Sequence, residues 1–204
     1  MSPRPLIVAC GALARELRAV LTASGLTEAI EVTYLPAHLH NRPDQIVPAL
    51  RPLVQAAVDR DRPVFVGYSD CGTGGLLDAM LAEFPGVVRL PGAHCYEMFA
   101  GESRFASMHD AALGTLYLTD YLALHFDALV WGGLGLDRHP QLRDTYFGNY
   151  TRVVLLAQSD DGAAYEGARS AAEKLGLAFE RVHVGRVGIE EAVGSFASLA
   201  VSGA

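Results

Sequence analysis

The stretch PVFVGYSDCGTGG, residues 63–75, joins a short apolar run to a glycine-rich turn, and it decides how the rest of the chain is interpreted. Its first half, with valine, phenylalanine and tyrosine, is typical of a buried β-strand. The turn contains Cys71 and leads into GGLLDAMLAEF (74–84), which has the apolar pattern of a helix. A strand, a tight turn and a helix in this order form the repeating unit of an α/β protein.

Apolar runs of the same kind recur along the chain and alternate with segments of helical periodicity. Strands are predicted over PLIVAC (5–10), AIEVTYL (29–35), PVFVGYS (63–69), GVVRLP (86–91), GTLYLTD (114–120), ALVWGGLG (128–135), TRVVLLAQ (151–158) and AFERVHVG (178–185). Helices are predicted over 11–25, 45–60, 74–84, 97–111, 121–126, 140–150, 162–176 and 188–201. This order predicts an α/β fold: a doubly wound, mostly parallel, Rossmann-like sheet with helices on both faces. We expect a single α/β domain over 1–204, or two similar halves that meet near residue 110.

The composition indicates a globular protein and excludes two classes of partner. Half of the 204 residues are hydrophobic, and the formal net charge is −7. An acidic chain repels phosphate backbones, so no nucleic acid is expected, and no apolar run approaches the roughly 20 residues of a membrane helix. Pro3, Pro5 and the lack of a small-residue cleavage site argue against a signal peptide, which predicts a cytoplasmic protein. In a reducing compartment, three cysteines are not a disulfide framework.

All three cysteines follow predicted strands. Cys10 ends the first strand, Cys71 lies just past the third, and Cys95 follows the fourth. Ligands of open parallel sheets bind outside the carboxyl ends of the strands, so the three thiols are expected at one edge. Thiolates are soft ligands that suit zinc or an iron–sulfur cluster, and neighbouring thiolates repel one another unless a cation neutralises them. We therefore predict a metal site of Cys10, Cys71 and Cys95 that holds Zn²⁺ or a [4Fe–4S] cluster.

Two alternative roles for the cysteines stay open, and the fourth ligand is less well defined. The chain has no C-x-x-C pair, so one thiol could be a reactive nucleophile, or all three could be buried core residues. The loop AHLHN places His38 and His40 after the second strand. His40, which is followed by the turn signal NRP, is the preferred fourth ligand; the alternative is a pair of surface histidines.

Carboxylates and glycines near the cysteines are further candidates. Glu97 could act as a general acid or base or favour the start of a helix, and Asp70 could orient a ligand or cap the next helix. The candidate cofactor-binding glycines are Gly72 and Gly74, in a turn where phosphate could dock, and Gly132 and Gly133, at another predicted strand end. The turn CGTGG is neither a Walker motif nor G-x-G-x-x-G, and WGGLGLD is also consistent with a simple tight turn.

These segments resemble the family known as domain of unknown function 1638. The resemblance rests on IVACGAL, LPAHLHNRP, VGYSDCGTGG, LPGAHCYEMFAG and GTLYLTDYL, and it continues through YFGNYTRVVLL over most of the chain. Many relatives carry an acidic residue where this chain has His94, so no particular role for His94 follows. Members are often encoded near corrinoid proteins, methyltransferases of the trimethylamine type and folate enzymes. The resemblance therefore implies a role in one-carbon metabolism without supplying a reaction.

Three functional hypotheses follow. The first is a metal-dependent enzyme, a lyase or transferase, that acts on a small-molecule substrate in one-carbon or methylamine metabolism, with corrinoid or folate-dependent methyltransferase proteins as partners. The second is a non-catalytic accessory or cofactor-delivery protein for a corrinoid methyltransferase system. The third is a phosphate- or nucleotide-binding domain that uses CGTGG. The sequence leaves the metal, the substrate and the oligomeric state open.

Overall fold

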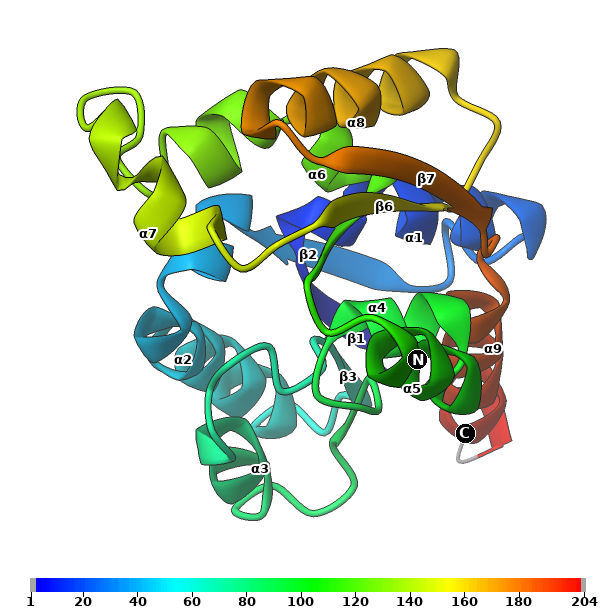
Figure 1. The fold of residues 1–204 in the computed structure, drawn as a ribbon. Helices are drawn as coiled ribbons and strands as arrows, with labels where there is room; N and C mark the ends of the chain where they lie inside the picture. The colour runs from blue at the N-terminus through cyan, green and yellow to red at the C-terminus, as the bar shows by residue number, and fades with distance from the viewer. Residues whose placement is uncertain (1–2, 203–204) are drawn as a thin grey trace. The chain divides into compact units, whose positions relative to one another are not determined.

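The structure, a computed structural model, describes residues 3–202 and divides the chain into two compact units (Figure 1). The first unit comprises Met1–Met98 and Val187–Ala204, and the second comprises Phe99–Arg186. Each unit contains its own parallel sheet. The expectation of one α/β domain over 1–204, or of two similar halves meeting near 110, stays a prediction.

The first unit contains a four-stranded parallel sheet in the order β2-β1-β3-β4. Its strands are β1 (Leu6–Cys10), β2 (Glu31–Leu35), β3 (Val64–Gly67) and β4 (Val88–Arg89). The central strands β1 and β3 are buried at every residue, as their uninterrupted apolar sequences predict. The chain adds β2 on one side of β1 and then β3 and β4 on the other. The sheet therefore has a topological switch point between β1 and β3.

Helices connect these strands, and one returns from the far end of the chain. They are α1 (Ala14–Ala23), α2 (Ile46–Val58), α3 (Leu76–Leu81), α4 (Cys95–Ala100) and α9 (Val187–Ser202). α1 buries Leu17, Val20 and Leu21, which is the i, i+3, i+4 spacing of an amphipathic helix. α9 packs against α1, and the centre of its Phe196 ring lies 5.5 Å from that of Phe65 on β3. The last helix thus completes the core of the first unit.

The second unit contains a three-stranded parallel sheet in the order β5-β6-β7. Its elements are α5 (Glu102–Ala111), β5 (Thr115–Thr119), α6 (Asp120–Leu124), α7 (Arg143–Phe147), β6 (Arg152–Ala157), α8 (Gly162–Leu175) and β7 (Ala178–His183). α8 lies along β6 and β7 in Figure 1. Asp161 caps the start of α8, and its carboxylate accepts the Ala163 N–H at 2.8 Å; Gly176, in the left-handed conformation, caps the end.

One predicted strand is wrong. The segment ALVWGGLG (128–135) forms no strand, because Asp127–Trp131 is a π-helix and turns follow it. Directly after β5, the Thr119 hydroxyl accepts the Leu122 N–H at 3.2 Å and starts α6. The chain is therefore already helical when it reaches the apolar residues of this segment. The periodicity of a short apolar run does not distinguish a strand from a helix, and here the Thr119 cap favours the helix.

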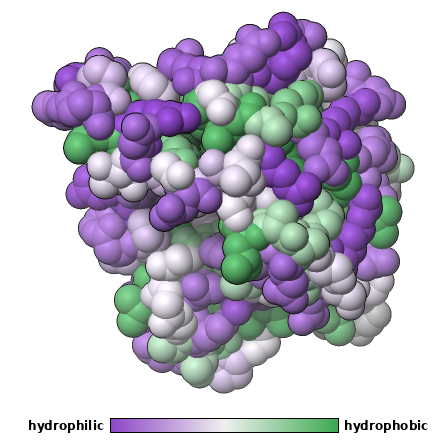
Figure 2. All heavy atoms as spheres, in the orientation of Figure 1, coloured by the Kyte–Doolittle hydropathy of each residue, from purple (hydrophilic) through white to green (hydrophobic). Residues whose placement is uncertain are grey.

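The predicted fold class is confirmed. Both sheets are parallel and are surrounded by helices, as in Rossmann-like α/β proteins. In the part of the chain that the structure describes, no helix is long and apolar enough to cross a membrane. The face drawn in Figure 2 carries mostly hydrophilic residues with hydrophobic ones scattered among them, in keeping with a net charge of −7.

Candidate functional site

The three cysteines lie at the carboxyl ends of three neighbouring strands. Cys10 is the last residue of β1, Cys71 follows β3 in the next loop, and Cys95 is the first residue of α4, after β4. β3 pairs with β1 on one side and with β4 on the other, so the three segments leave the same edge of the sheet. This edge includes the topological switch point, where ligands of doubly wound sheets bind.

The loop that carries Cys71 is hydrogen-bonded to the segment that precedes Cys95. The bonds run from the Cys71 N–H to the Ala93 carbonyl (2.8 Å), from the Asp70 N–H to the Gly92 carbonyl (3.1 Å) and from the Ser69 hydroxyl to the Pro91 carbonyl (2.7 Å). The Cys71 sulfur also interacts with the backbone N–H of Cys95. These contacts hold the two cysteines in adjacent segments.

Burial and mutual repulsion favour the neutral form of the three thiols. Burial and the nearby Cys10 raise the pKa of Cys71 to about 12. Burial, then Cys71 and Cys10, raise the pKa of Cys95 well above its usual value. Burial also raises the pKa of Cys10, although the Ala12 N–H and the Tyr68 hydroxyl oppose that rise. The thiols are thus close enough to act on one another electrostatically.

These neighbouring thiols are not arranged as ready-made ligands. Among residues 3–202, no group of three or more His, Cys, Asp or Glu side chains has the arrangement of a metal site. Cys10 is buried, whereas Cys71 and Cys95 keep part of their surface exposed. A cation would therefore approach from the side of Cys71 and Cys95, and the loops would have to draw the three sulfurs together.

The backbone at Cys71 is in the left-handed region, with φ of +51°. Gly72, Gly74 and Gly75 follow with φ of +83°, +63° and +85°, so the turn depends on residues without a side chain at three of its positions. For a cysteine the left-handed conformation costs roughly 1–2 kcal/mol. Strain of this kind is concentrated at functional sites, and it singles out Cys71 within the loop.

The Asp70 carboxylate shapes this loop. It accepts hydrogen bonds from the Thr73 hydroxyl (2.5 Å), the Gly75 N–H (2.9 Å) and the Gly74 N–H (3.1 Å). Partial burial alone would raise the pKa of Asp70, but these donors and Arg89 lower it. The observed contacts are those of a loop-positioning carboxylate; its predicted catalytic role stays a prediction.

The same hydrogen bonds leave the turn CGTGG few free donors for a phosphate. The Gly74 and Gly75 N–H groups donate to the Asp70 carboxylate, and the Cys71 N–H donates to the Ala93 carbonyl. In addition, the Thr73 N–H donates to the Asp70 carbonyl and the Leu76 N–H to the Thr73 carbonyl. The Leu77 N–H donates to the Thr73 hydroxyl at 3.3 Å. A phosphate cradle needs several backbone N–H groups that point at the ligand, and here most of them are occupied.

Glu97 fixes the start of α4. Its carboxylate accepts the Ala93 N–H at 3.1 Å and packs over Gly92, where a Cβ would overlap it. This reach back from the third residue of a helix resembles a capping box. Glu97 therefore positions the segment that carries Cys95, and its predicted role as general acid or base stays a prediction.

The histidine loop reaches the same edge of the sheet. His40 lies in the short 3₁₀ helix Ala37–Asn41, which follows β2. Burial and the neighbouring His94 lower the pKa of His40, although His40, like His38, is an exposed residue. Because His94 directly precedes Cys95, the loop after β2 lies near the segment that carries Cys95. The structure thus places His40 beside His94, and its role as fourth ligand stays a prediction; His38 is exposed.

Tyr68 is a residue of this site that no sequence motif singles out. It directly follows β3, is 2% exposed, and its hydroxyl has no conventional hydrogen-bond partner among the described residues. Burial, then Cys10 and Cys71, raise the pKa of Tyr68, so the phenol lies beside two of the three thiols. The signal that could have found it is a polar aromatic residue between an apolar strand and Cys71.

The predicted glycine site at Gly132 and Gly133 is not at a strand end. Both glycines belong to the second unit and follow the π-helix Asp127–Trp131. A Cβ at Gly132 would lie 3.1 Å from the Asp127 carbonyl, so that glycine allows a tight turn. Their predicted place at a sheet edge is therefore wrong; whether they bind a cofactor stays a prediction.

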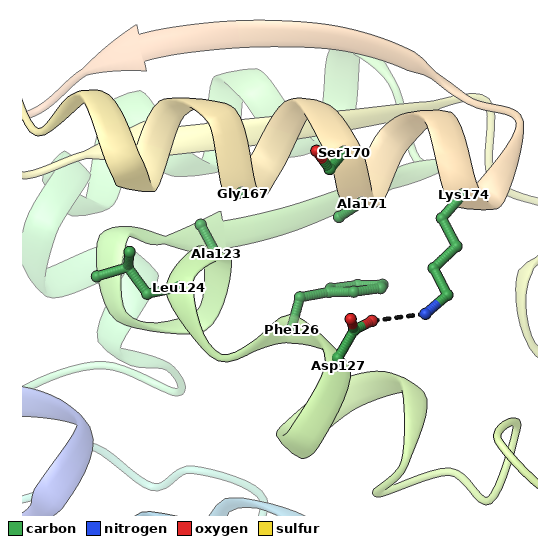
Figure 3. Close-up of a pocket in the computed structure, with 8 residues that line it drawn as sticks. All are labelled: Ala123, Leu124, Phe126, Asp127, Gly167, Ser170, Ala171 and Lys174. Carbon is green, nitrogen blue, oxygen red and sulfur yellow. Dashed lines mark hydrogen bonds and ion pairs between the residues drawn. The ribbon is translucent and has the colours of Figure 1, made fainter.

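A cavity of about 210 Å³ lies between α6 and α8 of the second unit (Figure 3). Its lining residues are Ala123, Leu124, Phe126, Asp127, Gly167, Ser170, Ala171 and Lys174. The Lys174 amine lies 2.6 Å from the Asp127 carboxylate and 4.2 Å from the centre of the Trp131 ring. These two contacts already use the charge of the lysine, and none of the predicted site residues lines this cavity.

Comparison with known proteins identifies one relationship. A family model described as "Protein of unknown function (DUF1638)" matches residues 34–193. The matched region includes His40, Cys71 and Cys95 and begins after Cys10. No curated protein and no solved structure matches the chain.

Proposed function

The chain belongs to the DUF1638 family of proteins of unknown function, and within that family we propose that it is a metal-binding protein with a three-cysteine centre. Cys10, Cys71 and Cys95 would hold Zn²⁺ or a [4Fe–4S] cluster at the carboxyl edge of the four-stranded sheet. His40 is the proposed fourth ligand, unless that position stays open for substrate. The proposal also includes a cytoplasmic location, where the three unpaired cysteines would remain reduced.

One observation supports this proposal: all three cysteines lie at the carboxyl edge of one parallel sheet and act on one another electrostatically, although they are distant in sequence. The hydrogen bonds between the loops of Cys71 and Cys95, and the strained backbone of Cys71, hold two of the thiols at that edge.

The residues present fit a thiophilic metal in two respects. Three thiols form a donor set that hard cations such as Mg²⁺ do not prefer, and a cation would remove the mutual repulsion of their thiolate forms. The buried Tyr68 hydroxyl, which has no conventional partner, lies where a thiolate would accept its proton in a hydrogen bond. Against this, the sulfurs are not yet arranged as ligands, so binding would require the glycine-rich loop to adjust.

The chain's own residues would orient the centre and its substrate. Asp70 and Glu97 hold the two cysteine loops through backbone N–H groups, and the imidazoles of His40 and His94 stand nearby to hold or move a proton. Bound zinc would supply Lewis acidity or hold a substrate thiolate, and a cluster with one open iron would bind substrate for elimination or sulfur chemistry. We propose a small-molecule substrate from one-carbon or methylamine metabolism, and corrinoid or folate-dependent methyltransferase proteins as partners.

Elemental analysis of protein purified without oxygen tests the centre. Wild-type protein is expected to hold stoichiometric zinc and be colourless, or to hold iron and sulfide with a broad visible absorbance. Cys10→Ser, Cys71→Ser and Cys95→Ser are each expected to lose the metal. If His40 is the fourth ligand, His40→Ala weakens binding about 10- to 100-fold, and His38→Ala, on the same loop, is the matched control.

Three results would contradict the proposal. They are wild-type protein without metal, loss of metal in only one cysteine variant, and metal content unaffected by all three substitutions. Turnover assays on methylated amines with the loaded protein then separate an enzyme from an accessory protein that delivers a cofactor. Tight binding of inorganic phosphate by metal-free protein would instead favour the phosphate-binding hypothesis, for which the turn CGTGG has few free donors.

A further inference from the structure

We propose that Tyr68 is a positioning residue of the three-cysteine centre, and that its hydroxyl donates a hydrogen bond to the Cys10 sulfur when that sulfur is a metal-bound thiolate. This inference rests on the proposed function. It adds a residue that no cysteine or histidine pattern identifies. It also distinguishes the three sulfurs, since only the Cys10 sulfur would accept a hydrogen bond from Tyr68.

The strand register places Tyr68 beside Cys10. The last pairs of β1 and β3 are Val8 with Val66 and Ala9 with Gly67. Tyr68 follows the end of β3, and one further step of this register would bring it opposite Cys10. Paired residues of adjacent strands project to the same face of a sheet. Both side chains are buried, with exposures of 8% for Cys10 and 2% for Tyr68.

A close approach of the two strands fixes this pairing. A Cβ at Gly67 would lie 2.6 Å from the Ala9 Cβ, closer than two carbon atoms can approach without a shift. Only a glycine at this position lets β3 run so near to β1. The phenol that follows Gly67 is therefore held against the end of β1, where Cys10 stands.

Within the described part of the chain, no partner of the Tyr68 hydroxyl has full hydrogen-bond geometry, although the hydroxyl interacts with the Cys10 sulfur. It is buried and has no conventional hydrogen-bond partner among the described residues. A buried hydroxyl without a partner requires an explanation, because native proteins pair nearly all such groups. A neutral thiol is a weak acceptor, whereas a thiolate accepts a charge-assisted hydrogen bond, so conversion of Cys10 to a thiolate would satisfy the phenol.

A second donor points at the same sulfur. The Ala12 N–H and the Tyr68 hydroxyl both interact with the Cys10 sulfur as hydrogen-bond donors. Hydrogen bonds to a ligating sulfur orient it and withdraw charge from it, which affects metal affinity and, in a cluster, the reduction potential. Tyr68 would thus contribute to holding the metal while contacting it only through Cys10.

The test compares Tyr68→Phe with wild type in the metal-free and metal-loaded forms. In the metal-free protein, removal of an unpaired hydroxyl is expected to leave Tm unchanged or to raise it. In the loaded protein, the same substitution is expected to lower Tm and to weaken zinc binding about 10- to 100-fold. With Co²⁺ in place of zinc, the thiolate-to-metal charge-transfer band is expected to move to lower energy; in a cluster, the reduction potential falls.

Tyr117→Phe is the matched control, because it removes a hydroxyl from another buried tyrosine, in the second unit. Its effect on Tm is expected to be the same with and without metal.

Three outcomes would overturn the inference, and they are distinguishable. If wild type holds metal and Tyr68→Phe shifts Tm equally in both forms with an unchanged spectrum, Tyr68 only packs, and the three-cysteine centre still stands. If wild type binds neither zinc, Co²⁺ nor a cluster, the proposed function fails and this inference fails with it. Both comparisons use Tyr68→Phe protein with a native circular dichroism spectrum. If the metal-free variant does not fold, the Tyr68 hydroxyl stabilises the metal-free protein, which contradicts the inference.

Discussion

At the scale of single residues, the site is defined by side chains in unfavourable surroundings. Cys71 combines a left-handed backbone with a pKa raised to about 12, and Tyr68 buries a hydroxyl without a conventional partner. Each feature alone is a small cost to folding. Tyr68 and Cys71 lie at the same sheet edge as Cys10 and Cys95. In the proposed function, a bound cation would stabilise this group of side chains.

The raised pKa of Cys71 predicts slow alkylation of this thiol in the metal-free protein. At pH 8, a thiol with a pKa of about 12 has roughly a thousandth of the thiolate of an ordinary thiol, but that thiolate is more nucleophilic. The net expectation is a reaction with iodoacetamide roughly 30- to 60-fold slower than in denaturant. The rate should rise as pH rises toward 12, because alkali increases the thiolate fraction.

Mass spectrometry of the Cys71 peptide after timed alkylation measures this rate. The same peptide in urea is the control, since unfolding removes both the burial and the neighbouring thiols. A folded protein that reacts at the unfolded rate at pH 8 would contradict the proposed environment of Cys71.

At the scale of elements, glycines decide which segments can approach one another. Gly11 lies directly after Cys10, and a Cβ there would lie 2.8 Å from the Leu35 carbonyl, so this glycine lets the loop after β1 pass close to the end of β2. Gly67 does the same between β1 and β3. The edge that gathers the cysteine loops is therefore assembled through positions where no side chain fits.

The same steric effect predicts opposite results for two glycines of α9. A Cβ at Gly188 would overlap the Met98 carbonyl of α4, so Gly188→Ala is expected to destabilise the protein by about 1–3 kcal/mol. Gly194 is exposed in the same helix and a Cβ there meets nothing within 4 Å. Gly194→Ala is the matched control and should stabilise by up to about 1 kcal/mol, because alanine favours helix.

Urea unfolding of the two variants measures both effects. Equal changes in the midpoint for Gly188→Ala and Gly194→Ala would show that helix propensity alone matters, and that α9 does not depend on close contact with Met98.

At the scale of the whole molecule, every candidate metal ligand belongs to the first unit. Cys10, His40, Cys71 and Cys95 all lie within Met1–Met98, whereas Gly132, Gly133 and the cavity beside Lys174 belong to the second. The family match spans parts of both units. The proposed metal ligands thus belong to one unit alone.

Metal removal is therefore expected to act on one unit. Chelation of the loaded protein should speed hydrogen exchange in the loops after β1, β3 and β4, because the bound ion no longer joins them. Exchange in β5, β6 and β7 should stay unchanged. Mass spectrometry of exchanged peptides measures this pattern, with Cys95→Ser as a control that chelation does not alter. Equal loss of protection in both units would contradict a site confined to the first.

Much of the element order could be predicted from the sequence, and the site only in part. Burial patterns such as that of β1 are local, so an apolar run ending at Cys10 correctly predicts a buried strand that stops there. The strand predicted over 128–135 is wrong because its apolar run fits strand and helix equally, and the Thr119 cap two turns earlier decides between them. Tyr68 escapes prediction because its significance depends on Cys10, a residue far from it in sequence.

The sequence by itself determined the α/β class, the alternation of strands and helices, and the position of each cysteine at or after the end of a strand. These properties depend on periodicities of two to four residues, which are local. Only the tertiary structure decided that the strands form two sheets, that β1 and β3 are neighbours at a switch point, and that α9 returns to the first unit. Those choices depend on contacts between distant segments, because the hydrophobic effect that drives them has no direction and does not specify a partner.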